Sequence, residues 1–413
     1  MKNLILGLMV LFIGGTSTAQ SINELYKASM DAKSNGDFQK FKELNLEVLK
    51  KHPSQPTILY NTSVAYQKLH MPDSSRFYME KLISWNTKTQ FKEDDFDFSV
   101  PDSTYWKNLE QLKHDYEAQI ETSEKSFEIE GMHHIEDILV LKKDIYLTDI
   151  KNRALLKIDR KTKAISVIME FGQYPIALAL DQNKGSMWVS LGNVLDDSEH
   201  GNESFLYEID LASGKKISEI ELPPSTLLGS MISIKDRLWA TNSKQPQVLI
   251  IDTEKAKLLE TIEVGEAYNL QGITWDKPSK QFYISDYIKG ICSFDLKNPS
   301  ERTWYSSKDF LLKGFDGLLS IGNSKLIAIQ NNSRPNRVVL LDIDSNNVVK
   351  VDLIDNNLGY EGEPTNMCFE KGKGVYYIAN SAWPFYNKEK KPIAEKWENQ
   401  EIRFIPIEKL MTK

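Results

Sequence analysis

The chain has 413 residues, 41% of them hydrophobic and 26% charged, which is the composition of a folded protein with room for more than one domain. Lys and Arg number 51 and Asp and Glu 58, so the formal net charge is −7 at pH 7. This balance argues against nucleic acid and against an anionic membrane as partners, because both attract basic proteins.

Residues 1–19 have the pattern of a cleaved secretory signal. An apolar run from Leu4 to Ile13 follows a lysine, and small residues lead to Ala19. The apolar run is too short to span a membrane, and no later segment is long enough. We therefore expect a periplasmic or secreted protein without a transmembrane segment.

Residues 20–125 are predicted to be helical. Apolar residues recur at spacings of three and four, with breaks at Asn35-Gly36 and Met71-Pro72-Asp73 and prolines between them at a helix start. The segment resembles a pair of tetratricopeptide hairpins, followed by one more helix near Tyr105 to Ile120. Such repeats stack into concave surfaces that bind proteins, so a protein partner is one expectation for this domain.

Residues 126–413 change to the alternating pattern of β-strands. Six short runs recur: "DIYLTD", "SMWVSL", "RLWATN", "QFYISD", "KLIAIQ" and "GVYYIAN". Five of them are followed by a run that ends in aspartate, at Asp159, Asp210, Asp252, Asp295 and Asp342, so the repeat is 42 to 51 residues long. This is the length of one four-stranded propeller blade, and the sequence therefore predicts an all-β, six-bladed β-propeller after a small helical domain.

Oxygen-bearing side chains occur where four of the six predicted inner strands begin. They are Glu130, Gln271, Asp316, and either Thr365 or Asn366. Because inner strands line the central channel of a propeller, we expect these side chains to meet on its axis and to bind a divalent cation. The alternative is that they are ordinary turn residues, since Asp-Gly and similar pairs also mark turns.

Several of these stretches carry a family resemblance. The strand starts "QGITWD" and "DGLLSI", the blade segment "YISDYIKGICSFDL" and the stretch "EPTNMCFEKGKGVYYIANSAW" are similar to the senescence marker protein, gluconolactonase and luciferin-regenerating enzyme family. The resemblance spans about residue 127 to the end. It implies calcium or zinc on the axis, held by Glu130, Gln271 and Asp316, with Asp316 also catalytic in lactone hydrolysis. The family position of Gln271 is typically Asn, so the resemblance is incomplete at the metal site.

Further candidates lie in predicted loops near the channel mouth. The loop "IQNNSRPNRV" holds Asn331, Asn332, Arg334 and Asn336; of these Asn332 and Arg334 are predicted to bind the substrate, as are Asn380 and Trp383 in "YYIANSAWPFYN". Arginine suits this role because its guanidinium binds carboxylates and polarised carbonyls. The alternative is a solvated loop with a turn at Pro335, and tryptophans that only pack between blades. His134 is a weaker catalytic candidate, because only one residue of the His133-His134 pair can face the channel.

Two functions follow from these patterns. The first is a metal-dependent hydrolase that acts on a small lactone or ester. The second is a propeller without enzymatic activity, which binds a ligand or protein together with the helical domain. Cys292 and Cys368 are expected to be free thiols, and the chain has no phosphate loop, nucleophile elbow or His-Glu-x-x-His motif.

Overall fold

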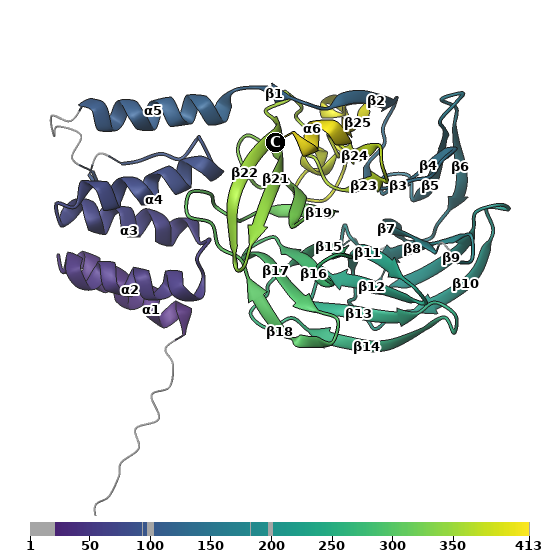
Figure 1. Ribbon diagram of the computed structural model, residues 1–413, viewed down its shortest axis with the longest axis horizontal. Helices are drawn as coiled ribbons and strands as arrows, with labels where there is room; N and C mark the ends of the chain where they lie inside the picture. Colours follow the sequence, from purple (N-terminus) through teal and green to yellow (C-terminus); the bar gives the residue numbers. More distant parts are fainter. Residues whose placement is uncertain (1–20, 93, 97–102, 182, 197–200, 413) are drawn as a thin grey trace, which may run out of the picture.

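A helical domain and a six-bladed β-propeller lie side by side in the computed structural model, which describes residues 21–92, 94–96, 103–181, 183–196 and 201–412 (Figure 1). The predicted propeller and its preceding helices are confirmed. The predicted signal, residues 1–19, lies outside the described residues. Within the described ranges, no helix is long and apolar enough to cross a membrane, and both cysteines are free thiols.

In the described residues, five helices form the first domain, and local sequence explains where several of them begin. Ser21 and Glu24 form a capping box at the start of the first helix, while Pro56 and Pro72 occupy first-turn positions of the third and fourth. Gly36, with φ of +74°, turns the chain between the first two helices. The helices are α1 (Ile22–Ser34), α2 (Phe38–Lys51), α3 (Pro56–Lys68), α4 (Pro72–Trp85) and α5 (Ser103–Glu117).

The propeller is built from antiparallel sheets of four strands arranged around one axis (Figure 1). Its first five blades are β3–β6, β7–β10, β11–β14, β15–β18 and β19–β22, and the sixth is β23, β24, β25 and β2. The strands are β1 (Ile120–Glu121), β2 (Glu124–Ile129), β3 (Ile135–Val140), β4 (Asp144–Asp149), β5 (Ala154–Asp159), β6 (Ile165–Glu170), β7 (Tyr174–Asp181), β8 (Ser186–Gly192), β9 (Phe205–Asp210), β10 (Lys216–Glu221), β11 (Leu228–Ile234), β12 (Arg237–Asn242), β13 (Gln247–Asp252), β14 (Lys257–Glu263), β15 (Leu270–Asp276), β16 (Gln281–Asp286), β17 (Gly290–Asp295), β18 (Asn298–Trp304), β19 (Phe315–Gly322), β20 (Lys325–Gln330), β21 (Arg337–Asp344), β22 (Asn347–Asn356), β23 (Met367–Glu370), β24 (Gly374–Ile378) and β25 (Gln400–Pro406). Two short 3-10 helices, η1 (Trp383–Phe385) and η2 (Ala394–Lys396), precede β25, and α6 (Ile407–Met411) follows it.

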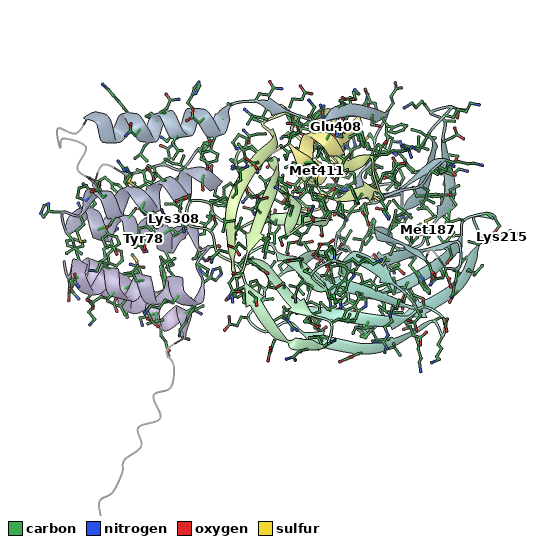
Figure 2. All side chains as sticks on the ribbon, in the orientation of Figure 1. Tyr78, Met187, Lys215, Lys308, Glu408 and Met411 are labelled. Carbon is green, nitrogen blue, oxygen red and sulfur yellow. The ribbon has the colours of Figure 1, made fainter. Side chains whose placement is uncertain are left out.

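Apolar side chains fill the spaces between neighbouring blades. Met187 of β8 is fully buried in such a layer, whereas Lys215 lies exposed at the tip of the β9–β10 hairpin (Figure 2). Aspartates at the ends of the third strands, such as Asp159, accept backbone hydrogen bonds from the turn that follows. Four aspartates of the repeat, Asp159, Asp210, Asp252 and Asp295, therefore mark the turn after a third strand. Asp342 instead lies inside β21 and accepts from Lys325 Nζ at 2.6 Å.

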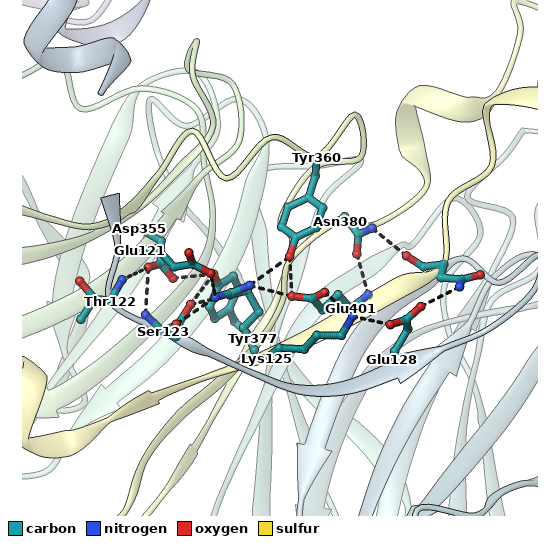
Figure 3. Close-up of polar contacts among 12 residues, drawn as sticks. Glu121, Thr122, Ser123, Lys125, Glu128, Asp355, Tyr360, Tyr377, Asn380 and Glu401 are labelled. Carbon is teal, nitrogen blue, oxygen red and sulfur yellow. Dashed lines mark hydrogen bonds and ion pairs between the residues drawn. The ribbon is translucent and has the colours of Figure 1, made fainter. Parts of the chain in front are cut away.

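The ring is closed by pairing strands from the two ends of the propeller. β2 pairs with β25, and β1 adds to the outer edge of the fifth blade. Figure 3 shows the polar network at this closure: the Arg403 guanidinium donates to Ser123 Oγ at 2.7 Å, to Ser123 O at 2.9 Å and to Glu401 Oε1 at 2.7 Å. Asp355 accepts from the backbone of Thr122 and Ser123. The segment that precedes the first blade is thus the outermost strand of the last one.

A β-bulge occurs near the axial start of the inner strand in each of the first five blades. The register shifts lie between Ile135 and Ile138, Pro175 and Leu178, Leu228 and Ser230, Leu270 and Ile273, and Phe315 and Leu318. Bulges re-aim side chains and are frequent beside active sites. The pairs Gln271-Gly272 and Asp316-Gly317 are therefore bulge residues rather than hairpin turns.

Hydroxyl groups on the second strands hold these bulges together across blade boundaries. Ser285 accepts from Gly272 N at 2.8 Å and donates to Asp316 O in the next blade at 2.7 Å. In the same way, the Thr148 hydroxyl accepts from Asp137 N and donates to Ile176 O in the next blade, both at 2.9 Å. We call these contacts hydroxyl bridges; they are made by Thr148, Ser190 and Ser285, and Thr241 supplies the donating half to Gln271 O.

Glycine is required where two bulges approach each other. A Cβ atom on Gly272 would lie 2.6 Å from Leu318 N and 2.7 Å from Asp316 O, both backbone atoms of the next blade. We expect Gly272→Ala to lower the free energy of unfolding by at least about 3 kcal/mol, because the backbone of one blade must move. Urea unfolding of the purified chain measures this loss. The control Gly265→Ala, where no atom lies within 4 Å of the new Cβ, is expected to unfold like the wild type.

Candidate functional site

Three carboxylic acids from three blades lie near one another at one end of the propeller axis. Glu136 belongs to the bulge of β3, Asp316 to the bulge of β19, and Glu363 precedes β23. We call them the axial acids. The Glu136 carboxylate accepts from Trp383 Nε1 at 2.8 Å and lies 3.4 Å from Ser381 Oγ. Glu363 is fixed through its backbone, which exchanges hydrogen bonds of 3.0 and 2.7 Å with Ser381.

The axial acids hold protons more tightly than ordinary carboxyl groups do. Burial, and then the nearby Glu363, raises the pKa of Asp316 to about 8. Burial raises the pKa of Glu363 to about 7, against the opposing charge of Arg334. Burial, and then Asp316, raises the pKa of Glu136 well above its ordinary value. Acids with a pKa near neutrality in a channel are typical of proton-transfer or ion-binding sites.

Asn331, at the end of the β20 hairpin, orients Asp316. Its Nδ2 donates to Asp316 Oδ2 at 2.8 Å and to Pro364 O at 3.0 Å. Because both partners are acceptors, the amide orientation is fixed and Oδ1 faces the other way. Asn331 is 2% exposed, and its Oδ1 has no hydrogen-bond partner among the residues that the structure describes. A buried oxygen without a hydrogen-bond partner, next to a carboxyl group, can coordinate a cation or accept a hydrogen bond from a ligand.

His134 lies on the first-blade side of the same cluster. It is fully buried, its Nδ1 shares a hydrogen bond of 3.0 Å with the Tyr386 hydroxyl, and its Nε2 lies 3.8 Å from Glu136 Oε2. Burial lowers the pKa of His134 to about 3, so the ring is neutral at physiological pH. His133 points elsewhere and bonds Asp149 at 2.6 Å. Only His134 of the pair faces the axial acids, as its register predicted.

The predicted metal ligands do not all lie with Asp316. Glu130 is exposed in the connection between β2 and β3, and its place beside Asp316 is taken by Glu136. Gln271 is half-buried, and its Nε2 donates to Asn269 Oδ1 at 2.6 Å, which leaves Oε1 near the neighbouring bulge at Gly229. Asn366 is half-buried and accepts from Met367 N at 2.9 Å.

The predicted substrate-binding residues divide into two groups. Trp383 contacts the axial acids directly, and Arg334 is exposed at the channel mouth, where its charge acts on Glu363. Asn332 packs against Gly314, whose φ is +75°. Asn380 is 1% exposed; it accepts from Glu401 N at 2.6 Å and donates to Glu398 Oε2 and to Asn399 O. Its amide is therefore occupied within its own blade.

Sequence reasoning missed Glu136, Glu363 and Asn331 as members of the cluster. The sequence pattern places Glu130 at the start of the first blade, because the residues of β2 have the pattern of a strand that belongs to that blade. In the structure, β2 is the outermost strand of the last blade. The hydroxyl bridges supply a better alignment: Thr148 and Ser285 follow the bulge residues Glu136 and Gln271 by about 12 to 14 positions. Once the structure has identified these hydroxyls, the offset aligns Glu136, and not Glu130, with Gln271.

The oxygen-rich chemistry of the cluster suits a hard cation, but the acids do not form a closed shell by themselves. Across the ranges described, no three His, Cys, Asp or Glu side chains lie close enough together to hold a metal ion. Any ion at this position therefore needs neutral oxygens in addition to carboxylates. The unpartnered Oδ1 of Asn331 is such an oxygen.

No protein-family model and no curated protein matches this sequence. Solved structures with a similar fold include the allergen Mala s 1 of Malassezia sympodialis, at 14% identity over 69% of this chain and 95% of that chain, with a TM-score of 0.49. A gluconolactonase from Xanthomonas campestris matches at 13% identity over 67% and 88% of the two chains, with a TM-score of 0.47. The aldose sugar dehydrogenase of Streptomyces coelicolor, in its PQQ-bound form, matches at 9% identity over 68% and 96%, with a TM-score of 0.48. Likenesses this low carry no inference about chemistry, and the family resemblance in the sequence stays a prediction.

The raised pKa values predict how stability varies with pH. Asp316 and Glu363 have pKa values of about 8 and about 7 in the folded chain, against ordinary values of 3.8 and 4.5. Between these limits the folded state binds more protons than the unfolded state, so the free energy of unfolding falls as pH rises from about 4 to about 8. Urea unfolding at several pH values, with chelator present, measures this slope.

The variant Asp316→Asn tests the origin of the slope. Because the amide does not titrate, the fall in stability with rising pH is expected to be smaller than in the wild type. The control Asp236→Asn changes an exposed aspartate between β11 and β12 and is expected to keep the wild-type slope. Equal slopes in wild type and Asp316→Asn would contradict the assignment.

Proposed function

We propose that the axial acids form the active site of a cation-dependent hydrolase that acts on a small lactone or ester. The observation that carries this proposal is the meeting of Glu136, Asp316 and Glu363 in one half-buried cluster, with a pKa of about 8 for Asp316 and of about 7 for Glu363. Like charges at close range cannot all be ionised unless a cation compensates them. A bound divalent cation would relieve this repulsion.

The residues present fit such an ion in type. Carboxylate oxygens of Glu136 and Asp316 and the unpartnered Oδ1 of Asn331 are oxygen donors, which calcium prefers, while Glu363 keeps its proton for the reaction. Zinc, the other ion that the resemblance implies, also accepts carboxylate oxygens as ligands. Gln271 and Asn366, the neutral residues predicted from the sequence, would complete the set through their amide oxygens. Glu136 replaces Glu130 in this proposal.

When bound, a divalent ion supplies Lewis-acid polarisation of the substrate carbonyl. Asp316 would act as general base once the charge of the ion has lowered the pKa of its carboxyl: its Oδ2 accepts from Asn331, so Oδ1 would take the proton from the attacking water. Glu363, whose pKa is about 7, acts as general acid and donates its proton to the leaving alkoxide. Trp383 holds the Glu136 carboxylate in place through its indole N–H.

The location of the protein belongs to the same proposal. Cleavage of residues 1–19 would deliver the chain to the periplasm or to the medium. Detection of the mature chain, starting near Gln20, in the periplasmic or secreted fraction tests this point by mass spectrometry.

Cation binding is expected to stabilise the folded chain. At a calcium concentration about 100 times the Kd, linkage predicts a gain of about 2.7 kcal/mol in the free energy of unfolding. Thermal unfolding in calcium, in zinc and in chelator measures the gain. Asp316→Asn is expected to lose most of it, whereas Asp236→Asn keeps it. If neither ion shifts the unfolding of the wild type, the cation is excluded from the proposal.

Hydrolysis is expected to depend on Glu136 and not on Glu130. With D-glucono-1,5-lactone as the probe, Asp316→Asn and Glu136→Gln are expected to lower kcat/KM by about 100-fold or more, since general acid–base and electrostatic contributions are of this size. Glu130→Gln, an exposed matched change, is expected to keep wild-type kcat/KM. The rate of acid release at constant pH is the measurement. A wild type that binds the cation without turnover would instead favour a ligand-binding propeller.

A further inference from the structure

Arg334 presents a vacant hydrogen-bonding edge at the channel mouth. Its Nη1 donates to Ser333 O and Asn336 Oδ1, both at 2.8 Å, and to Asn331 O at 3.3 Å. Its Nε and Nη2 make no hydrogen bond to the described part of the chain. These two groups form the edge of a guanidinium that binds a carboxylate through two parallel hydrogen bonds.

Arg334 also lines a pocket that includes Glu363, one of the axial acids. The pocket has a volume of about 280 Å³, and its lining includes Arg334, Asn336, Asn357, Tyr360 and Glu363. Glu363 is shared between the pocket and the axial acids, because its charge acts on Asp316 and Glu136. A ligand held at Arg334 therefore extends toward the proposed reaction centre.

The helical domain fixes the backbone of Arg334 on both sides. Arg334 N donates to Trp85 O at 2.9 Å, and Thr87 donates to Arg334 O from its backbone N at 3.0 Å and from its hydroxyl at 3.2 Å. Asn86, between them, forms a parallel β-bridge with Arg334. The residues that follow α4 thus pair with the β20–β21 loop of the propeller as a short strand would.

A second guanidinium supports the same contact. Arg337 is 1% exposed, donates to Trp85 O at 3.2 Å and to Ser333 Oγ at 3.1 Å, and lies over the Tyr116 ring of α5. It forms no ion pair with any acid in the described ranges. Its charge is therefore uncompensated next to the Arg334 loop, and it adds to the positive potential there.

We propose that residues 85–87 of the helical domain position Arg334 so that its Nε–Nη2 edge binds a carboxylate group of the substrate. The inference rests on the proposed function, because it takes the substrate to be a lactone or ester. This substrate also has a free carboxylate group at a distance from the reacting carbonyl. A carboxylate is planar and carries a single charge, so it matches the two parallel N–H groups of an arginine guanidinium. A phosphate dianion suits the site less, because Glu361 and Glu363 also line the pocket.

The test compares a charged and a neutral lactone of similar size. D-glucaro-1,4-lactone carries a free carboxylate, whereas D-glucono-1,4-lactone does not. The wild type is expected to prefer the charged lactone, and Arg334→Gln is expected to lower the ratio of their kcat/KM values by about 10- to 100-fold, mainly through KM. The control Arg237→Gln, on an exposed position of β12, is expected to leave the ratio unchanged.

A second variant addresses the positioning role of the helical domain. Thr87→Pro removes the backbone N–H and the hydroxyl that bond Arg334 O, and it is expected to lower the same ratio by about 3- to 10-fold. Thr87→Ser keeps both donors and is expected to retain the wild-type ratio. A purely structural role would lower kcat/KM for both lactones alike. An unchanged ratio in Thr87→Pro, with a fall in Arg334→Gln, would overturn the positioning role.

A binding measurement separates this inference from the proposed function. Isothermal titration with D-glucarate, which has no bond to hydrolyse, is expected to show binding to the wild type that weakens at least about 10-fold in Arg334→Gln. If glucarate binds in this way and neither lactone is hydrolysed, the carboxylate site stands and the hydrolase proposal fails. If lactones are hydrolysed without preference and glucarate does not bind, the hydrolase stands and the carboxylate site is overturned. If glucarate does not bind and the wild type shows no preference between the two lactones, the carboxylate site is also overturned.

Discussion

The hydrogen bond from a second-strand hydroxyl to the bulge of the next blade is the contact on which the axial site depends. Each bridging hydroxyl satisfies an N–H in its own blade and a carbonyl in the following one, as Ser285 does between Gly272 and Asp316. A bulge leaves backbone groups unpaired, and burying them without partners would be costly. The bridges remove that cost and fix the spacing of the inner strands. Side chains on the bulges, Asp316 among them, are thereby held at the axis.

The cluster of acids gathered there opposes folding. Glu136, Asp316 and Glu363 lie in an environment that disfavours their ionised forms, and no lysine or arginine in the described residues forms an ion pair with them. A folded chain retains such groups when the surrounding structure determines their positions and when they serve chemistry or ion binding. The hydrogen bonds from Asn331 and Trp383 orient the carboxylates without supplying a compensating charge.

The helical domain and the propeller are joined at the loops that surround this site. Arg334 is bonded through its backbone to the end of α4, and the Asn356 side chain donates to Tyr116 O and Ala118 O at the end of α5. The helices therefore contact the loops around the site, and the proposed binding of a carboxylate at Arg334 depends on that contact. Glu363, shared by the pocket and the axial acids, connects the channel mouth with the proposed reaction centre.

The sequence by itself determined the helical first part and the six-bladed propeller, because helix caps, alternation and turn aspartates are local signals that repeat along the chain. It also identified Asp316, Trp383, Arg334 and His134, which lie at the channel. The tertiary structure alone decided that β2 closes the last blade, and so replaced Glu130 by Glu136 at the axis. The positions of Glu363 and Asn331 beside Asp316 were likewise recognisable only in three dimensions. The physical reason is that ring closure and approach of blades are contacts between distant segments, and local periodicity carries no information about which strand pairs with which.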